Sequence, residues 1–197
     1  MKNTTFVNNL IYHIYNRGVE KRNIFTETKD YSRFMSDLQQ FNTMGSVINH
    51  GRNFENPAIE VEHQSRGIKK VLVEILAFCL MPNHFHLMIK QKTKQGITEF
   101  MRKLGTGYTN YFNIKNQRVG PLFQGKFKAV LLNKEKYFMY LPHYIHINPL
   151  NLMPKTSNES KMEFLKRYQW SSLPDYMGIR KHYNFVNKDF IIGCAGG

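Results

Sequence analysis

The sequence has few cysteines and few acidic residues, and it lacks long apolar runs. Only two cysteines occur among its 197 residues, Cys79 and Cys194, and their spacing matches no disulfide framework. A reducing, cytoplasmic setting is therefore expected. No apolar run is long enough to span a bilayer, and the first residues lack the apolar stretch and cleavage site of a signal peptide. These absences argue against a disulfide-stapled secreted protein and against a membrane partner.

Basic residues outnumber acidic ones two to one. The chain has 28 lysines and arginines against 14 aspartates and glutamates, a net charge of +14. Such an excess favours a polyanionic partner, because each phosphate that a cation neutralises releases condensed counterions. Together with an aromatic content of 14%, it favours a nucleic acid over a merely basic soluble protein or one that binds anionic lipid.

Local patterns predict an α+β order of elements. β-branched and aromatic residues between turn signals predict four strands, at residues 6–15, 70–81, 84–91 and after Pro121 with a break at Gly125. Apolar residues at helical spacing predict three helices, with Thr28, Thr98 and Asn133 as N-caps. The order β-α-β-β-α-β-α predicts a ferredoxin-like antiparallel sheet with helices packed on one face.

The length fits one domain over residues 1–197. Within it, the polar stretch 43–67, broken by Gly and Pro, is expected to be a loop or an insertion. Residues 150–197 carry the only tryptophan and no strong periodicity, and they are expected to form a C-terminal extension.

Two histidines flank one phenylalanine in the apolar run LMPNHFHLMI. In a strand, His84 and His86 share one face, while Phe85, Leu87 and Ile89 point to the other, which is the natural core face. The two histidines are either polar residues on the half-solvated face of a sheet or part of a divalent metal site. The second interpretation needs a third ligand.

The best candidate for that third ligand lies in the segment HYIHINP. Tyr144 and Asn148 are four residues apart and therefore share one face of the predicted helix. Set over the histidine pair, they would give a metal with two nitrogen ligands and one oxygen ligand, with a tyrosine beside it. The remaining coordination positions would accept phosphate oxygens. Pro142, two residues before Tyr144, is expected to kink this helix or to start a new one.

Four segments, MPNHFH, GPLFQGKFK, YIHINP and WSS, together resemble the single-tyrosine HUH transposases. The REP-associated tyrosine transposases and related insertion-sequence enzymes are the most similar branch. HUH denotes histidine, bulky hydrophobic, histidine, which His84-Phe85-His86 fits. The likeness extends from Tyr12 to Ser172, most of the chain.

The resemblance implies roles for four residues. His84, His86 and Asn148 would bind a divalent metal, Mg²⁺ or Mn²⁺, and Tyr144 would be the nucleophile. The family cleaves single-stranded DNA by transesterification, which leaves a 5′-phosphotyrosine link and a free 3′-hydroxyl, and recognises hairpins beside the cleavage point. Exchange of one phosphodiester for another needs no ATP, and the sequence has no phosphate-binding P-loop motif.

Other tyrosines compete for the role of nucleophile. Tyr140 lies one turn before Tyr144, and Tyr108 and Tyr111 lie at helical spacing that is more typical of core residues. Tyr144 is preferred because Asn148 and the following proline anchor it in the motif.

Six residues are expected to contact DNA, although an edge strand or a solvated surface is the alternative interpretation for each of them. Basic and apolar residues alternate after the turn at 120, and further cations follow the first strand. The six residues are Arg17, Lys21, Arg22, Gln124, Lys126 and Lys128.

Two other functions stay open at this point. One is a catalytically silent nucleic-acid-binding regulator on the same fold, and the other is a hydrolytic zinc enzyme, which no cluster of cysteines or carboxylates supports. Composition does not decide between a monomer and a homodimer, since the resembling family contains both.

Overall fold

The computed structural model describes residues 5–45, 70–180 and 185–195, and most of the expected 43–67 insertion lies outside these ranges. In chain order the elements are β1 (Ile11–Arg17), η1 (Val19–Lys21), α1 (Thr28–Gln40), β2 (Val73–Met81), β3 (His84–Gln91), α2 (Gly96–Lys115), β4 (Lys128–Leu131), α3 (Glu135–Ile147), η3 (Asn148–Leu152), α4 (Lys161–Arg167), α5 (Leu173–Tyr176) and α6 (Lys188–Ala195). The predicted order of strands and long helices is confirmed.

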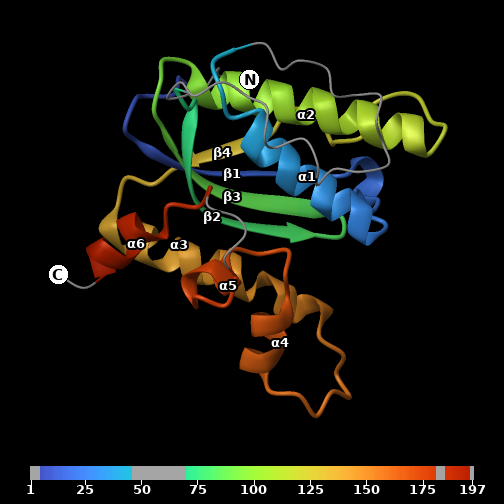
Figure 1. Cartoon of the computed structure of the whole chain (residues 1–197), viewed down its shortest axis with the longest axis vertical. Coiled ribbons are helices and arrows are strands. Elements are labelled where there is room, and N and C mark those ends of the chain that lie inside the picture. Colours follow the sequence, from blue (N-terminus) through green and yellow to red (C-terminus); the bar gives the residue numbers. More distant parts are fainter. Residues whose placement is uncertain (1–4, 46–69, 181–184, 196–197) are drawn as a thin grey trace.

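The four strands form one antiparallel sheet in the order β2-β3-β1-β4 (Figure 1). Strands β2 and β3 form the predicted hairpin, in which Met81 pairs with His84 across the turn Pro82-Asn83. Strand β1 lies between β3 and β4 and pairs with both in regular register. The α+β antiparallel architecture is therefore confirmed, with β1 and β3 in its middle.

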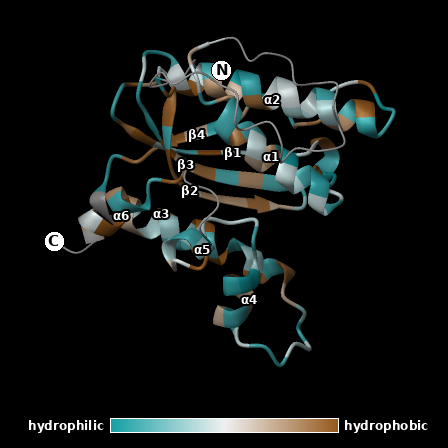
Figure 2. Ribbon diagram, in the orientation of Figure 1, coloured by the Kyte–Doolittle hydropathy of each residue, from teal (hydrophilic) through white to brown (hydrophobic). Residues whose placement is uncertain are grey.

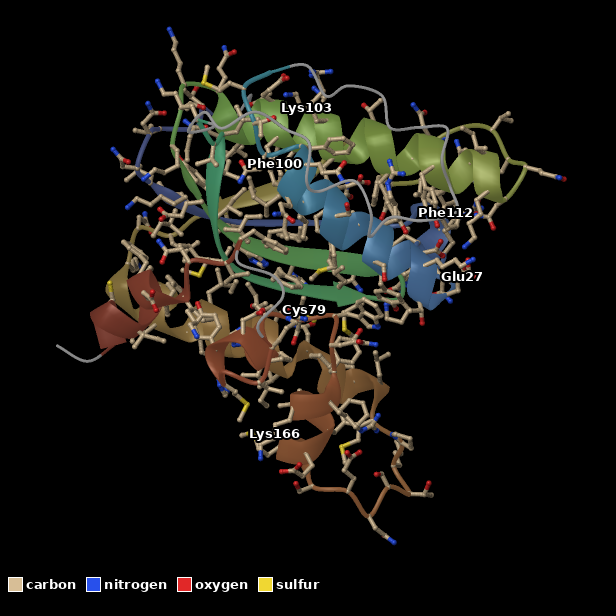
Figure 3. The ribbon with its side chains drawn as sticks, in the orientation of Figure 1. Glu27, Cys79, Phe100, Lys103, Phe112 and Lys166 are labelled. Atoms are coloured by element: carbon tan, nitrogen blue, oxygen red, sulfur yellow. The ribbon has the colours of Figure 1, made fainter. Side chains whose placement is uncertain are left out.

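Helices cover both faces of this sheet, so the prediction that they pack on one face was wrong. On one face, α1 and α2 bury Phe34 and Phe100 against Ile14, Phe85 and Leu87. Strand β2 is apolar along nearly its whole length, whereas β3 also contains hydrophilic residues at both ends (Figure 2). Figure 3 shows Phe100 and Phe112 near opposite ends of α2. This shared core fixes the register of each strand, because a shift of one residue would move every apolar side chain of the strand to the other face.

The opposite face is covered by α3 over β2 and β3. Leu141 and Ile145 of α3 pack there with Cys79 and Met88, and all four side chains are buried. Figure 1 shows α3, α5 and α6 on this side of the sheet, with α4 projecting away from it. Helix α3 thus lies on the face toward which His84 and His86 were expected to point. Among the described residues, no helix is both long and apolar enough to cross a membrane.

Strand β1 differs from its predicted bounds. It begins at Ile11 instead of residue 6, because Asn9 adopts a positive φ of 64° in a turn closed by a hydrogen bond from Leu10 N to Val7 O. It also continues through Arg17, which was expected to lie in a turn.

The three predicted N-caps were wrong by one to three positions. Helix α1 is capped by Glu27 instead of Thr28, since Glu27 and Asp30 form a reciprocal capping box. Helix α2 follows Gln95 rather than Thr98, and Glu99 N already donates to the Gln95 carbonyl. In α3, the cap is Lys134, one residue after the expected Asn133.

The C-terminal extension covers the free edge of β2. Leu80 N donates to the Trp170 carbonyl at 2.8 Å, and Ser172 N donates to the Phe78 carbonyl at 2.9 Å. The Trp170 ring also stacks on the Tyr31 ring, with 4.7 Å between centroids. An unpaired edge strand is a template for association with other chains, so these bonds protect the sheet.

Pro142 lies inside α3 and does not start a new helix, which was one of the two outcomes expected for it. The helix runs from Glu135 to Ile147, and the chain continues directly into η3, where Pro149 occupies the first turn. Tyr144 and Asn148 therefore follow each other by one turn of nearly continuous helical backbone.

Candidate active site

The middle of the sheet presents one row of polar side chains to the α3 face. Register places Tyr15 opposite His86 and Arg17 opposite His84, so the side chains of these pairs point to the same side. His13 lies two residues before Tyr15 and shares its face. Strands β1 and β3 thus bring together three histidines, a tyrosine and an arginine.

Helix α3 adds Tyr144 to this row, and Asn148 follows directly as its C-cap and the first residue of η3. The Tyr144 ring meets the His86 ring edge-on, with centroids 5.6 Å apart. Asn148 is 6% exposed and its side chain hydrogen-bonds with His84. The four residues expected to form the site are therefore neighbours in space, although 58 positions of the sequence separate His86 from Tyr144. They are His84, His86, Tyr144 and Asn148.

Each of the three expected metal ligands is held by a hydrogen bond on its far side. His84 Nδ1 lies 2.6 Å from Asn83 Oδ1, and Asn148 Nδ2 donates to the Tyr144 carbonyl at 2.8 Å. His86 Nδ1 lies 2.9 Å from His13 Nε2. His86 Nε2 is left for another partner, whereas the side chains of His84 and Asn148 hydrogen-bond with each other. Such outer bonds orient metal ligands in proteins.

Burial keeps both histidines of the pair neutral at pH 7. It lowers the pKa of His86 to about 3, and the neighbouring His13 and His84 lower this pKa further by charge repulsion. The pKa of His84 is also lowered by burial, against which the hydrogen bond with Asn148 acts. A neutral imidazole has a free lone pair on one nitrogen, which is the form that a metal requires.

Counting only histidine, cysteine and carboxylate side chains, no group of three or more among the described residues is arranged to hold a metal. Two imidazoles and the amide oxygen of Asn148 form the donor set that the geometry offers instead. Amide oxygens suit hard divalent cations, and imidazoles suit softer ones, so the mixed set fits Mn²⁺ and admits Mg²⁺.

Of the six residues expected to contact DNA, Arg17 and Gln124 lie closest to the pair. Arg17 Nε donates to Gln124 Oε1 at 2.5 Å, and the Arg17 charge acts on His84. Lys128 is opposite Tyr15 in the register of β1 and β4, which puts its exposed side chain on the site face. These three residues would present positive and polar groups beside the histidines.

The other three candidates are less clearly part of the site. The Lys21 carbonyl accepts a hydrogen bond from Asn83 Nδ2 at 3.3 Å, so Lys21 is next to the hairpin turn before His84. Arg22 forms an ion pair with Glu20 at 3.2 Å, which neutralises part of its charge. Lys126 is exposed in the loop that precedes β4.

Burial distinguishes the tyrosines that compete with Tyr144 for the role of nucleophile. Tyr108 is 0% exposed and its hydroxyl donates to the Ile24 carbonyl, so it belongs to the core. The Tyr111 hydroxyl donates to the buried carboxylate of Asp30. Tyr140 is 56% exposed and stacks on Tyr144, with centroids 6.2 Å apart, but of these two residues Tyr144 is the one whose ring contacts His86.

Sequence reasoning missed His13 and Tyr15, whose rings pack against each other and against His86. The available signal was the alternation of His13, Tyr15 and Arg17 along a predicted strand, which places the three side chains on one face. That signal identifies a polar face, whereas its alignment with His86 depends on the pairing of β1 with β3.

A fourth histidine connects α3 to the C-terminal extension. His146 Nε2 lies 2.7 Å from Ser172 Oγ, and Ser172 Oγ accepts a hydrogen bond from Phe78 N at 2.9 Å. Burial lowers the pKa of His146 to about 4, and the nearby His143 adds to this by charge repulsion. The serine thus links the helix that carries Tyr144 to the edge strand of the sheet.

This lowered pKa predicts a pH-dependent contribution of His146 to stability. The unfolded chain binds a proton at His146 below about pH 6.5, whereas the folded chain stays neutral down to about 4, so the stabilisation is present above pH 6.5 and is lost as pH falls toward 4. In His146→Gln, the slope of unfolding free energy against pH near pH 5 should be smaller by about 1.4 kcal/mol per pH unit. Urea unfolding of both proteins in EDTA at pH 7, 6 and 5 measures it, and equal slopes would contradict the prediction.

The structure places a histidine pair on a central strand below a tyrosine on a helix, which is the arrangement expected from the resemblance to the single-tyrosine HUH transposases. Residues 60–148 match the family model described as Transposase IS200 like, a segment that contains the pair and ends at Asn148. This segment is therefore similar to the IS200-like transposases.

One solved structure has the same fold over nearly the whole chain. It is described as "Structure of the REP associates tyrosine transposase bound to a REP hairpin", and its TM-score with this chain is 0.56 at 11% identity. The match covers 95% of this chain and 92% of the other. At this identity the likeness shows the fold alone. No curated protein matches the chain.

Proposed function

We propose that the protein cleaves single-stranded DNA and rejoins it by transesterification, with Tyr144 as nucleophile. The observation that carries this proposal is the contact of the Tyr144 ring with His86, at 5.6 Å between centroids, next to the hydrogen-bonded side chains of His84 and Asn148. The match of residues 60–148 to a transposase family model supports DNA transposition as the purpose of the reaction.

His84, His86 and Asn148 would hold a divalent cation, Mn²⁺ or Mg²⁺. Such an ion, when bound, offsets charge on the scissile phosphate and makes its phosphorus easier to attack. The protein itself supplies the orientation: the bonds from Asn83, His13 and the Tyr144 backbone fix the three donor groups before any ion arrives. The fixed donors reduce the reorganisation needed in the reaction.

In the first step, the Tyr144 oxygen would attack phosphorus, and the bond from phosphorus to the 3′-oxygen would break. The phenol gives up its proton, and the leaving 3′-oxygen takes one up, so that a 5′-phosphotyrosine and a free 3′-hydroxyl result. In the second step, a 3′-hydroxyl attacks the phosphotyrosine and releases Tyr144. One phosphodiester replaces another in each step, so no ATP is consumed.

The positive charge beside the pair suits the DNA backbone. Arg17 is held by Gln124 at the end of β1, and Lys128 lies on the same face of the neighbouring strand. An arginine fixed in this way can donate two parallel hydrogen bonds to a phosphate, which a mobile lysine does less well. These contacts would position the backbone and would not by themselves select a sequence.

The substrate that we propose is unpaired DNA next to a hairpin. The similar solved structure is described as bound to a REP hairpin, which supports a hairpin as the first probe. Tyr15 and the 56%-exposed Tyr140 flank Tyr144 and His86, and aromatic rings of this kind can stack on unpaired bases.

We also propose a cytoplasmic setting and action within one chain. Cys79 and Cys194 are free thiols, as expected of a reducing compartment. Tyr144 already contacts His86 of its own chain, which supports cleavage without a tyrosine from a second subunit. A homodimer stays a prediction that a mass measurement in solution would test.

A covalent-adduct assay tests the proposed reaction. Hairpins with randomised unpaired flanks are labelled at the 3′-end in one set and at the 5′-end in another, and incubated with Mn²⁺ or with EDTA. Since the tyrosine keeps the 5′-phosphate of the downstream fragment, only the 3′-labelled set should give labelled protein on a denaturing gel, and EDTA should remove it. A fully duplex probe is the control.

The same assay separates the alternatives. Hairpin binding without any adduct, across all flanks and in Mn²⁺ or Mg²⁺, would favour a catalytically silent regulator on the same fold. Multiple turnover without an adduct would indicate a hydrolytic enzyme. The neutral imidazoles of the site favour catalysis over the silent alternative.

A further inference from the structure

His13 lies on β1, in the middle of the sheet, and its ring contacts both His86 of β3 and Tyr144 of α3. Its ring stacks on the His86 ring, with centroids 5.1 Å apart and an interplanar angle of 26°. The Tyr144 ring meets the His13 ring edge-on, with 6.2 Å between the centroids. Between the two imidazoles, 2.9 Å separates His13 Nε2 from His86 Nδ1, which is a hydrogen-bond distance.

One proton must lie between these two nitrogens, and its place decides what His86 can do. A neutral imidazole carries a proton on one nitrogen and a lone pair on the other. If His13 donates, then His86 carries its proton on Nε2 and has no lone pair left for a metal. If His86 donates from Nδ1, its Nε2 is bare and available. Only the second arrangement is compatible with His86 as a ligand.

We infer that His13 is a positioning residue whose Nε2 accepts a hydrogen bond from His86 Nδ1 and thereby fixes the tautomer in which His86 Nε2 can bind a metal. The inference deepens the proposed function and rests on it for the role of His86. Asn83 does the same for His84, because its Oδ1 oxygen can only accept and lies 2.6 Å from His84 Nδ1. The two histidines of the pair are thus held in the same tautomer by two different neighbours.

His13 acts through His86 and is not itself a third ligand. Its Nε2 atom is engaged with His86 Nδ1, on the side of that ring away from the free Nε2. Among the residues that the structure describes, the three histidines are not arranged as a group that could hold one ion. A histidine that bonds the far nitrogen of a ligand histidine sets its orientation and its basicity.

Two substitutions separate the hydrogen bond from the packing. His13→Phe keeps a flat ring between Tyr15, His86 and Tyr144 but has no acceptor. His13→Gln loses the ring but has an amide oxygen that reaches the place of Nε2. The inference expects Gln to preserve the His86 tautomer and Phe to release it, whereas a role in packing alone expects the reverse order of damage.

The first measurement is the tautomer of His86, read from long-range ¹H–¹⁵N correlations of ¹⁵N-histidine-labelled protein at neutral pH without metal. Wild type and His13→Gln should show the Nδ1–H form. His13→Phe should shift His86 toward the Nε2–H form that dominates in free histidine. The second measurement is Mn²⁺ affinity by electron paramagnetic resonance of the free ion, which should fall about 10- to 100-fold in His13→Phe and only a few-fold in His13→Gln.

An Nε2–H tautomer of His86 in the wild type would overturn the inference, as would an unchanged tautomer in His13→Phe. If His13→Phe does not fold, as checked by circular dichroism, the wild-type tautomer and the His13→Gln protein still decide the question. The readout also separates this inference from the proposed function. A wild type with the expected tautomer but no DNA adduct would count against the reaction, while an active wild type whose Mn²⁺ affinity is equal in all three proteins would count against the role of His13.

Discussion

Tyr144→Phe is expected to reduce the covalent protein–DNA adduct by at least about a thousandfold, since loss of a nucleophile removes the reaction that it starts. The change deletes one hydroxyl and keeps the ring that packs against His13 and His86. Hairpin binding and thermal unfolding should therefore stay close to wild type. The measurement is the 3′-labelled adduct on a denaturing gel, quantified against the wild type at equal bound DNA.

Tyr140→Phe is the matched control for this prediction. Tyr140 is exposed, stacks on Tyr144 and lies one helical turn before it, so the same deletion is made on the same helix. The control should retain the adduct. An adduct that persists in Tyr144→Phe and disappears in Tyr140→Phe would transfer the nucleophile to Tyr140 and contradict the site as described.

His84→Ala is expected to weaken Mn²⁺ binding by at least about 100-fold. Loss of a residue that only orients a metal ligand already lowers metal affinity about 10- to 100-fold, and this substitution removes the expected ligand itself. The structure gives His84 two neighbours that orient it, Asn83 behind Nδ1 and Asn148 beside the ring, so an alanine leaves a gap where a donor atom was fixed. Calorimetric titration of Mn²⁺ into protein freed of metal by EDTA measures the change.

The matched control is His143→Ala, the same substitution at an exposed position of α3. His143 has a ring contact with Tyr140 and none with either histidine of the pair, so the Mn²⁺ affinity should not change. Equal affinities of wild type and His84→Ala would show that the imidazole at 84 is not a ligand, and the donor set would then have to be sought elsewhere.

The parts of the fold that follow from local pattern were predicted well. Strand β3 has the predicted bounds, and the hairpin at Pro82-Asn83 forms as expected, because alternation and a short turn act within a few residues. The spacing of Tyr144 and Asn148 likewise placed both on one helical face, and the structure brings them to the histidine pair. That these residues perform catalysis and bind metal stays a prediction.

Features that depend on distant parts of the chain were not predictable in the same way. Thr28 and Glu27 are both reasonable caps by type, and the choice depends on Asp30, whose carboxylate is fixed by Lys115 and Tyr111 of another helix. His13 became visible as a partner of His86 only through the register of β1 against β3. The bounds of the last strand were too long, since only Lys128–Leu131 pairs regularly with β1.

The bonds between β2 and the C-terminal extension have a consequence for chains that are shortened. A chain that stops before Trp170 keeps the strands and helices of the site but loses the backbone partners of Phe78 and Leu80, and it also loses the hydroxyl that His146 contacts. Its sheet then ends in a mostly buried, apolar strand with an open edge, which favours self-association. Nonsense and frameshift changes late in the gene are therefore expected to yield aggregation-prone protein rather than a smaller functional one, although every residue of the proposed chemistry is still present.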